Sequence, residues 1–325
     1  MLREHRKGAF ILKRLLEAGG GLVSGEELAL ELGVSRVALH KRIKRLVEMG
    51  IPIEAEERRG YRLSEEPDLL IPEVILAYMD EDCLFQRIEC YPVVDSTNRL
   101  AKEMAEKGAP EGTVVVADSQ TAGRGRLGRR WFSPAGRNLY FSVVLRPRLP
   151  AAFMYHATML ASVAVCEALR EVGVDALIKW PNDVYASGRK ICGVLTEAEV
   201  EGPHVAFLVV GIGVNVNIRS HEFPSLVAPI ATSVLEETGS RCNRSRLLAR
   251  ILSLMDGLYK KLAAGETKDL FYRWREHNYT IGRRVKLEDG TEGEAIGITP
   301  VGELLVRDEQ GSIITVAAGD VKVLQ

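Results

Sequence analysis

The chain has 325 residues and a formal net charge of −1, with 46% apolar and 27% charged residues. This composition is that of an ordinary soluble globular protein of two or three domains. No apolar run is long enough for a membrane-spanning helix, and the basic N-terminus predicts an amphipathic helix rather than a signal peptide. The five scattered cysteines lack a CxxC pair and the six histidines lack metal-ligand spacing, which favours reduced thiols in a cytoplasm and no zinc site.

Residues 1–64 predict a small basic domain that begins with helices. Leucines recur at helical spacing over residues 12–16, and residues 24–27 form a capping box that opens a second helix. That helix stops at Gly33, and a third helix begins near Ser35 with a strongly basic face. Two short helices joined by a tight turn, the second of them basic, are typical of a helix-turn-helix.

A β-hairpin is predicted over residues 51–63, and its basic tip would make this head a winged helix-turn-helix. Residues 1–64 hold 13 Lys and Arg against 9 Asp and Glu, and DNA binding needs such a local surplus of positive charge. The alternative is a helical bundle with a solvated basic face. We expect DNA contacts from Ser35, Arg36, Lys41, Arg42, Lys44, Arg45, Arg58 and Arg59.

Residues 65–85 are acidic, contain two prolines and predict a linker with one short helix. A central domain is then expected over residues 86–277. Its alternating or apolar runs predict several strands and helices along the chain. The strands are expected at 87–94, 113–117, 139–145, 177–185, 190–196 and 205–217, and the helices at 99–107, 157–172, 243–264 and 266–277.

The window 118–148 is the most unusual part of the central domain. After Asp118 it holds seven arginines and no acid, and its glycines Gly123, Gly125 and Gly128 allow a close backbone approach to a ligand. A GxGxxG match begins at Gly123, but a strand follows it where a dinucleotide-binding fold needs a helix. We therefore expect a flexible loop that closes over an anionic ligand, although a solvated basic loop is the alternative.

Two further polar clusters flank this loop in the sequence. Residues 95–98, Asp-Ser-Thr-Asn, precede a helix and are either a plain cap or a ligand site at the helix start. Lys179-Trp-Pro-Asn-Asp183 predicts a sharp turn between two strands. Strand alternation places Lys190 on the same face as Cys192, Val194 and Thr196, where it either points into a cleft or lies at a strand end.

The last segments predict a lid and a small third domain. Residues 218–232 are loop-like and could cover a pocket. Residues 278–325 contain short alternating runs separated by Gly-containing turns, which suit an SH3-like barrel, and nothing in them looks catalytic.

These motifs together resemble the biotin–protein ligases. They are Asp95–Asn98, GRGRLGR at 123–129 with Trp131, KWPND at 179–183, RKICG at 189–193 and GIGVN at 211–215, in the order seen in that family. The basic head resembles that of the bifunctional bacterial class, which is both a ligase and a repressor of the biotin operon. The fold class implied is a multi-domain α/β protein. It has an N-terminal winged helix-turn-helix, a central α+β ligase domain with a mixed sheet, and a C-terminal SH3-like barrel.

The resemblance implies an ATP-dependent, two-step reaction. Biotin and ATP give biotinyl-5′-AMP and pyrophosphate, and the biotin then passes to a lysine of a biotin carboxyl carrier protein. Three groups of side chains carry the implied roles. Lys190, Arg126 and Asp183 would be catalytic; Ser96, Thr97, Asn98, Gln120, Arg124, Gly125, Arg126 and Lys190 would bind biotin; and Gly123, Arg124, Asn182 and Asn215 would bind the nucleotide.

The resemblance also implies Mg²⁺ bound with ATP, a homodimer, and operator DNA of biotin genes as a partner, with biotinyl-5′-AMP as corepressor. The protein itself is expected to build no dedicated metal site. The lid candidate has no tryptophan, so a ring stacked on the adenine would have to be Phe223. The operator sequence, the strength of dimerisation and the range of carriers cannot be read from the sequence.

Three other functions stay open on the sequence. The chain could be a repressor that senses biotin without chemistry, a ligase of the lipoate-attachment type, or a biotin ligase whose head has lost DNA binding. The arginine-rich loop GRGRLGRRWFSP at 123–134 argues against the lipoate type.

Overall fold

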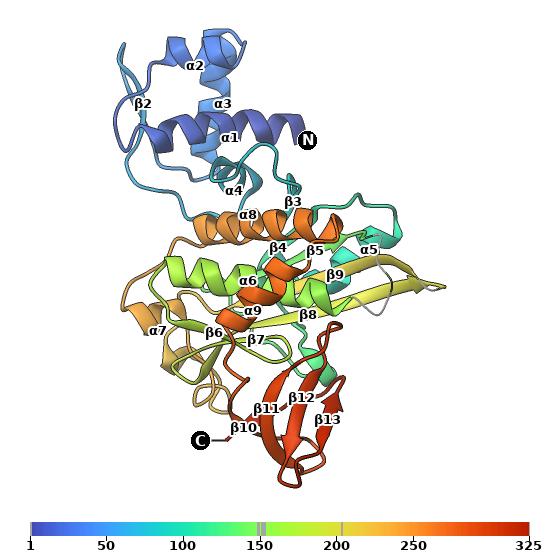
Figure 1. Ribbon diagram of the computed structural model, residues 1–325. Coiled ribbons are helices and arrows are strands. Elements are labelled where there is room, and N and C mark those ends of the chain that lie inside the picture. Colours follow the sequence, from blue (N-terminus) through green and yellow to red (C-terminus); the bar gives the residue numbers. More distant parts are fainter. Residues whose placement is uncertain (1, 148–149, 151–153, 203, 325) are drawn as a thin grey trace.

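The computed structural model describes residues 2–147, 150, 154–202 and 204–324. The chain forms three units that follow one another in space, with the head at one end, the central domain in the middle and the C-terminal unit at the other end (Figure 1). Arg148, one of the seven arginines of the loop window, lies outside the described residues. Among the described residues, no helix is both long and apolar enough to span a membrane.

The head is a helix-turn-helix with a two-stranded wing, as the sequence predicts. Ser24 and Ser35 cap its second and third helices: the Ser24 hydroxyl accepts from two backbone N–H groups of the first turn, and the Ser35 hydroxyl accepts from the N–H of Ala38. Leu12, Leu39 and Leu46 are buried where the three helices meet. The elements are α1 (Leu2–Glu17), α2 (Gly25–Glu31), α3 (Arg36–Glu48), β1 (Ile53–Glu56) and β2 (Gly60–Leu63).

A short helix, α4 (Pro72–Ala77), joins the head to the central domain. It contacts α1 on one side and α8 (Arg244–Ala263) on the other, and five of its six residues are buried. His5 of α1 lies 2.8 Å from the buried carboxylate of Glu73 in α4. The segment predicted as a linker therefore also packs as part of the interface between head and central domain.

The central domain is built on a seven-stranded mixed sheet in the order β3-β4-β5-β9-β8-β7-β6. Only the pair β3–β4 is parallel among these described strands, because α5 (Thr97–Glu106) connects them as a crossover. The other neighbours are antiparallel, which confirms the predicted mixed sheet. The strands are β3 (Arg87–Val94), β4 (Thr113–Gln120), β5 (Leu139–Leu145), β6 (Ala176–Lys179), β7 (Asp183–Ala186), β8 (Arg189–Glu201) and β9 (His204–Val214).

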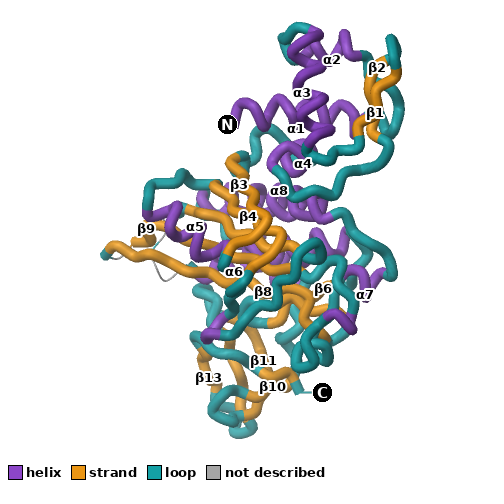
Figure 2. Tube along the Cα trace, turned by 180° about the vertical axis from the view of Figure 1, so that it is seen from behind, coloured by secondary structure: helices purple, strands orange, loops and turns teal. Residues whose placement is uncertain are grey.

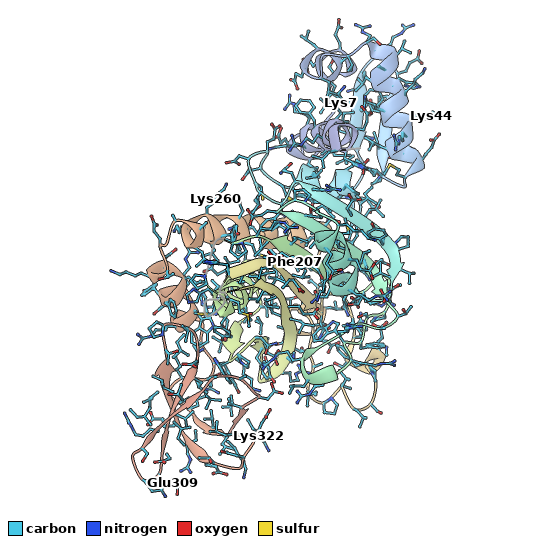
Figure 3. The ribbon with its side chains drawn as sticks, turned by 90° about the vertical axis from the view of Figure 1, so that its right-hand side faces the viewer. Lys7, Lys44, Phe207, Lys260, Glu309 and Lys322 are labelled. Atoms are coloured by element: carbon cyan, nitrogen blue, oxygen red, sulfur yellow. The ribbon has the colours of Figure 1, made fainter. Side chains whose placement is uncertain are left out.

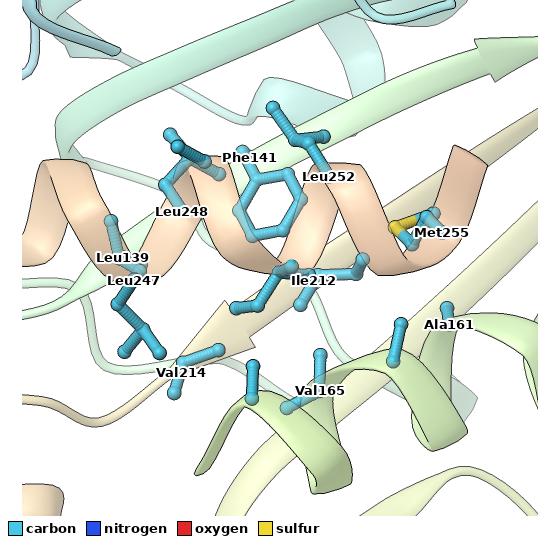
Figure 4. Close-up of a cluster of buried hydrophobic side chains, with 14 of the residues drawn as sticks. Leu139, Phe141, Ala161, Val165, Ile212, Val214, Leu247, Leu248, Leu252 and Met255 are labelled. Atoms are coloured by element: carbon cyan, nitrogen blue, oxygen red, sulfur yellow. The ribbon is translucent and has the colours of Figure 1, made fainter. Parts of the chain in front are cut away.

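Helices cover both faces of this sheet (Figure 2). On one face, α6 (Tyr155–Glu171) packs on β6, β7, β8 and β9, and α8 and α9 (Lys268–Glu276) pack beside α6. Phe141, Ile212 and Leu252 meet in this core (Figure 4). On the other face, α5 packs on β4, β5 and β9. This asymmetric cover leaves part of the second face free for a binding site.

A β-bulge in β8 overturns one expectation about Lys190. Tyr185 pairs with Lys190 and Val184 pairs with Cys192, so Ile191 is an extra residue that interrupts the alternation. Cys192 and Val194 are buried in the core that α6 covers, whereas Lys190 lies on the opposite face. Period-two alternation therefore placed Lys190 on the wrong face, because the bulge reverses the direction of every side chain before it.

The C-terminal unit is a five-stranded antiparallel sheet in the order β13-β12-β11-β10-β14, as expected of a small SH3-like domain. It is held against the central domain by the indole of Trp180, which donates to the carbonyl of Gly302 at 3.0 Å. The turn at Gly302 lies against the ring of Tyr155 in α6. Its strands are β10 (Arg284–Lys286), β11 (Glu292–Ile298), β12 (Leu304–Asp308), β13 (Ile313–Val316) and β14 (Lys322–Val323).

Candidate active site and DNA-binding surface

A cavity of about 270 Å³ opens on the face of the sheet that carries Lys190. Its walls come from the start of α5, the ends of β4, β6 and β9, the strands β7 and β8, the arginine loop, the segment after β9 and Asp320. Eleven of the predicted ligand-binding and catalytic residues line it. They are Ser96, Thr97, Asn98, Gln120, Arg124, Gly125, Arg126, Asn182, Asp183, Lys190 and Asn215. Gly123 belongs to the same loop but does not line the cavity.

One end of the cavity is a buried polar network at the start of α5. The backbone N–H of Thr97 donates to Gln120 Oε1 at 2.9 Å, and Asn98 Nδ2 donates to Glu197 Oε2 at 2.8 Å. The hydroxyl of Ser142 donates to Asn98 Oδ1 at 2.7 Å. Sequence reasoning missed Ser142 and Glu197, because neither stands in a motif and both reach the site only through the pairing of distant strands.

Glycines on β8 and β9 leave room for the side chains that form the floor of the cavity. A Cβ atom on Gly211 would stand 1.9 Å from Asn98 Oδ1, and one on Gly213 would stand 2.5 Å from the indole nitrogen of Trp131. Trp131 therefore lies flat on the strand, and its buried Nε1 has no hydrogen-bond partner among the described residues. The Lys190 ammonium lies 5.5 Å from the centre of this indole ring.

The arginine loop folds back on itself beside the cavity. The N–H of Trp131 donates to the Gly123 carbonyl at 3.0 Å, and that of Gly125 donates to the Arg129 carbonyl at 2.7 Å. A Cβ atom on Gly123 would stand 2.6 Å from the Trp131 carbonyl oxygen, so this position needs glycine. Gly123 therefore stabilises the loop through its backbone without lining the cavity itself.

Arg126 connects the loop to two other parts of the chain. Its guanidinium donates to Asn182 Oδ1 at 2.9 Å and to the Gly319 carbonyl at 3.3 Å, and it lies 3.6 Å from the carboxylate of Asp320. Asp320 also pairs with Arg129. Nothing in the C-terminal unit looks catalytic in the sequence, but its last turn supplies the carboxylate of Asp320 to the cavity wall.

Lys190 and Asp183 face each other in the middle of the cavity. Lys190 Nζ lies 2.6 Å from Asp183 Oδ1, a close ion pair whose angle does not satisfy hydrogen-bond geometry. Nearby, burial lowers the pKa of Lys179, and the positive charges of Lys190 and Arg129 act in the same direction, whereas Asp183 and Asp320 raise it. In the described part of the chain, six cations and two carboxylates line the cavity, so its field attracts anions.

The segment after β9 forms the apolar side of the cavity. Phe223, Val227 and Ile230 line it, and Phe223 is buried. The segment is fixed to β8 because the N–H of Lys190 donates to the Ile230 carbonyl at 2.9 Å. Asn215 holds the same segment through its side-chain amide, which donates to the Thr232 carbonyl at 3.0 Å. Phe223, the ring that the sequence offered as a cover for adenine, therefore lies at the cavity.

The predicted DNA-binding residues all lie on α3, at its cap or at the wing. Lys44 projects from α3 in the head (Figure 3), and Lys41 and Arg45 are also exposed. Arg36 pairs with Glu26 at 2.6 Å, while Arg58 and Arg59 at the wing tip pair with neighbouring glutamates.

Arg42 differs from the free basic side chains that the sequence predicts. Its guanidinium binds the carboxylate of Glu4 in α1 at 2.7 and 3.2 Å, and the Arg42 side chain is partly buried. The Arg42 guanidinium lowers the pKa of the Glu4 carboxyl. Arg42 therefore ties α3 to α1. Among the described residues, Lys41 and Arg45 have no ion pair.

Comparison with known protein families gives matches to all three units. The "Biotin/lipoate A/B protein ligase family" matches residues 90–215, the "HTH domain" residues 9–62, and the "Biotin protein ligase C terminal domain" residues 280–324. These matches cover the three units in the order in which they follow along the chain.

The chain is also similar over nearly its whole length to curated proteins. It is 35% identical to the "Bifunctional ligase/repressor BirA" of Bacillus subtilis, over 93% of this chain and 94% of that protein. It is 33% identical to the protein of the same name in Escherichia coli, over 92% of each. Among solved structures, the biotin protein ligase from Aquifex aeolicus in complex with biotin and ATP is 33% identical, with a TM-score of 0.63. That structure covers 74% of this chain, and all of its own chain is matched.

Proposed function

Because the chain belongs to the biotin–protein ligase family, in the class that also carries a DNA-binding head, we propose that it is a bifunctional biotin ligase and biotin-operon repressor. In the first step a carboxylate oxygen of biotin attacks the α-phosphate of ATP and gives biotinyl-5′-AMP and pyrophosphate. In the second step the amine of a carrier-protein lysine attacks the biotinyl carbonyl and releases AMP.

The observation that carries this proposal is that one cavity joins a hydrogen-bonding polar end to a strongly basic loop. The network of Thr97, Asn98 and Gln120 offers both donors and acceptors, which suits the ureido ring of biotin, while Trp131 gives an apolar wall. We assign biotin to this end, with Ser96 at the cap of the helix. A mostly apolar ligand with a few fixed polar contacts fits such a cavity.

With biotin at this end, its carboxylate and the α-phosphate of ATP lie beside Lys190 in this proposal. Its ammonium stabilises the charge on the α-phosphate as the carboxylate attacks, and the low exposure of the site strengthens this interaction. Arg124, Gly125 and Arg126 border the adenylate and exclude water, which would otherwise hydrolyse the mixed anhydride. Asn182 and Asn215 border the nucleotide, whose adenine lies against the apolar side at Phe223.

Asp183 serves the second step in this proposal. Its carboxylate lies 2.6 Å from Lys190 and can accept a hydrogen bond from the amine of the incoming carrier lysine. A carboxylate beside the anhydride orients this amine and accepts its proton as the amide forms. The carrier is a biotin carboxyl carrier protein, in keeping with the ligase names of the relatives.

Mg²⁺ accompanies ATP in this proposal and neutralises part of the phosphate charge when bound. The cavity offers only two carboxylates, Asp183 and Asp320, and each is already paired with a cation. This donor set fits an ion held mainly by phosphate oxygens and water, with at most one or two protein carboxylates.

The head serves repression. We propose that biotinyl-5′-AMP favours a homodimer, so that two heads bind the two half-sites of a palindromic operator of biotin genes. The exposed Lys41, Lys44 and Arg45 would contact the DNA backbone or bases. Because ATP, carrier and operator are all found inside the cell, we place the protein in the cytoplasm.

Mass spectrometry of a carrier domain incubated with the purified protein, biotin and ATP tests the ligase. We expect a mass gain of one biotinyl group on the carrier and none without ATP. Labelled ATP that yields no biotinyl-5′-AMP would favour a biotin sensor without chemistry, and modification by lipoate but not biotin would favour the lipoate type. A promoter fragment of the biotin genes that does not shift with biotin and ATP would leave a ligase without repressor function.

A further inference from the structure

Lys179 lines the cavity, but the reaction described above gives it no role. It ends β6 opposite Asp183 of β7, so the two side chains lie on the same face of the sheet. Among the described residues Lys179 has no ion pair, and its ammonium lies 5.2 Å from the centre of the Tyr185 ring. Since burial and two neighbouring cations lower the pKa of Lys179, its charged form gains from an added anion.

The number of cations at the cavity points to a ligand with more charge than the adenylate. The phosphate of biotinyl-5′-AMP carries a single negative charge, whereas the triphosphate of ATP carries several. In the described part of the chain the cavity is lined by Arg124, Arg126, Arg129, Arg130, Lys179 and Lys190. The proposed adenylation uses Lys190, Arg124 and Arg126, which leaves Arg129, Arg130 and Lys179 without a role.

Lys179 and Arg129 lie on the side of the cavity that faces the C-terminal unit. Asp320 of that unit pairs with Arg129 and lies 3.6 Å from Arg126. Asp320 also acts on Lys179, whose pKa it raises. A carboxylate at this position makes the contacts that a phosphate oxygen would make, so phosphate groups and Asp320 would compete for these cations.

An aromatic stack lies beside the Lys179 ammonium. The rings of Tyr185 and Tyr279 stack with centres 5.7 Å apart, and the guanidinium of Arg283 lies 4.0 Å from the centre of the Tyr279 ring. Lys179 caps the other end of this stack. A side chain that is already held by a ring contact loses less conformational entropy when it binds an anion.

We propose that Lys179, together with Arg129, binds the β- and γ-phosphates of ATP and stabilises pyrophosphate as it leaves. This role rests on the proposed adenylation. A biotin carboxylate oxygen bonds to the α-phosphorus while the bond from the α-phosphorus to the bridging oxygen breaks. That oxygen keeps the electron pair and leaves as part of pyrophosphate. Lys179 and Arg129 stay protonated and stabilise the charge that develops there.

Separate assays of the two half-reactions test this role with Lys179→Gln. In the first, biotinyl-5′-AMP formation from [α-³²P]ATP is measured against ATP and against added pyrophosphate. In the second, ready-made biotinyl-5′-AMP is supplied with a carrier domain. We expect KM for ATP and the pyrophosphate concentration that halves the rate each to rise at least about tenfold, since a charge-assisted contact is lost. Transfer from supplied adenylate should stay within about twofold, because no contact to the adenylate is lost.

Three further variants make the test specific. Lys179→Arg should restore part of the pyrophosphate inhibition, because it keeps the charge. Lys286→Gln, a half-exposed lysine of β10 paired with Glu292, serves as the matched control and should leave both half-reactions unchanged. Arg129→Gln, at an exposed side chain, tests the same subsite should Lys179→Gln fail to fold.

Two results would overturn the inference. One is equal loss of both half-reactions in a folded Lys179→Gln protein, which would mean a role in adenylate binding or in structure. The other is unchanged KM for ATP and unchanged pyrophosphate inhibition in Lys179→Gln or, if that variant does not fold, in Arg129→Gln. A wild-type protein that forms no adenylate at all would instead reject the proposed function.

Discussion

Lys190 is the residue on which the proposed adenylation depends most directly. It lies between the aromatic wall at Trp131 and the carboxylate of Asp183, so its ammonium is held at the centre of the cavity. Neither contact is needed for the core, since Cys192 and Val194 on the other face of β8 provide that packing. Chemistry and stability are therefore separable at this position.

We expect Lys190→Ala to lower biotinyl-5′-AMP synthesis by at least about 100-fold while leaving the fold intact, because it removes a preorganised cation from the transition state. Adenylate formation from labelled ATP and a thermal melting curve measure the two effects. Lys102→Ala, a surface lysine of α5 paired with Glu199, is the control. A fully active Lys190→Ala enzyme would remove the role assigned to this residue.

Arg126 is expected to act on retention of the intermediate. Its guanidinium is held by Asn182 and by the last turn of the C-terminal unit, so it is positioned before any ligand arrives. We expect Arg126→Ala to speed the loss of labelled biotinyl-5′-AMP from the purified complex about tenfold, the cost of one charge-assisted contact. Arg170→Ala, whose guanidinium pairs with Asp175 at the end of α6, should retain it normally. Equal retention in both variants would argue against the assignment.

At the scale of elements, two backbone features of the sheet shape the cavity: a bulge in β8 and the glycines of β8 and β9. The bulge at Ile191 turns Lys190 to the open face, and the glycines of β8 and β9 let Asn98 and Trp131 lie against the strands. The bulge and the glycines both act through the backbone, and the pairing of the strands fixes where each of them lies. The strands therefore determine which side chains the helix α5 and the arginine loop bring together.

Gly211→Ala tests the second of these features. Its Cβ would stand 1.9 Å from Asn98 Oδ1, so we expect the Asn98 side chain to move and the affinity for biotin to fall at least about tenfold. Titration calorimetry with biotin measures this change. Gly257→Ala in α8 is the matched control, because its Cβ would meet nothing within 4 Å. In a helix this control should stabilise the protein by roughly 0.5–1 kcal/mol. Unchanged biotin affinity in Gly211→Ala would contradict the placement of biotin at Asn98.

At the scale of the whole molecule, both ends of the chain reach the central domain. Asp320 of the C-terminal unit lines the cavity, and α4 packs between the head and α8. The coupling between head and central domain includes the contact of His5 with the buried Glu73. The proposed ligase site and the proposed DNA-binding surface therefore lie on separate parts of one connected protein.

DNA binding should be separable from ligation by substitutions on α3. We expect Lys41→Ala with Arg45→Ala to weaken operator binding and to reduce the slope of log K against log salt by about two, as two phosphate contacts are lost. Gel shifts over a range of salt measure this, and carrier biotinylation should be unchanged. Arg42 is a poor choice for this test because it ties α3 to α1 through Glu4. A double variant that binds DNA normally would move the interface elsewhere on the head.

Local features of the sequence predicted much of the fold. Strands Arg87–Val94 and Leu139–Leu145 are found at the bounds that their alternation or apolar character indicates, and Ser24 and Ser35 cap the helices they precede. Strand β4 extends beyond the predicted 113–117, because Ser119 and Gln120 also pair with β3. These residues are polar, so the apolar pattern of the sequence did not include them. The motifs that indicated a biotin ligase are likewise local runs whose residue types and order can be recognised without coordinates.

What the sequence by itself determined is the three-unit organisation, the type of most elements and the motifs of the family. Only the tertiary structure decided that Lys190 faces the cavity, that Asp320 and Glu197 reach the site, and that Arg42 is paired with α1. The physical reason is the sequence separation over which each interaction acts. Caps, turns and alternation act between residues a few positions apart, whereas a bulge or a contact between distant segments depends on which strands pair and how the units pack.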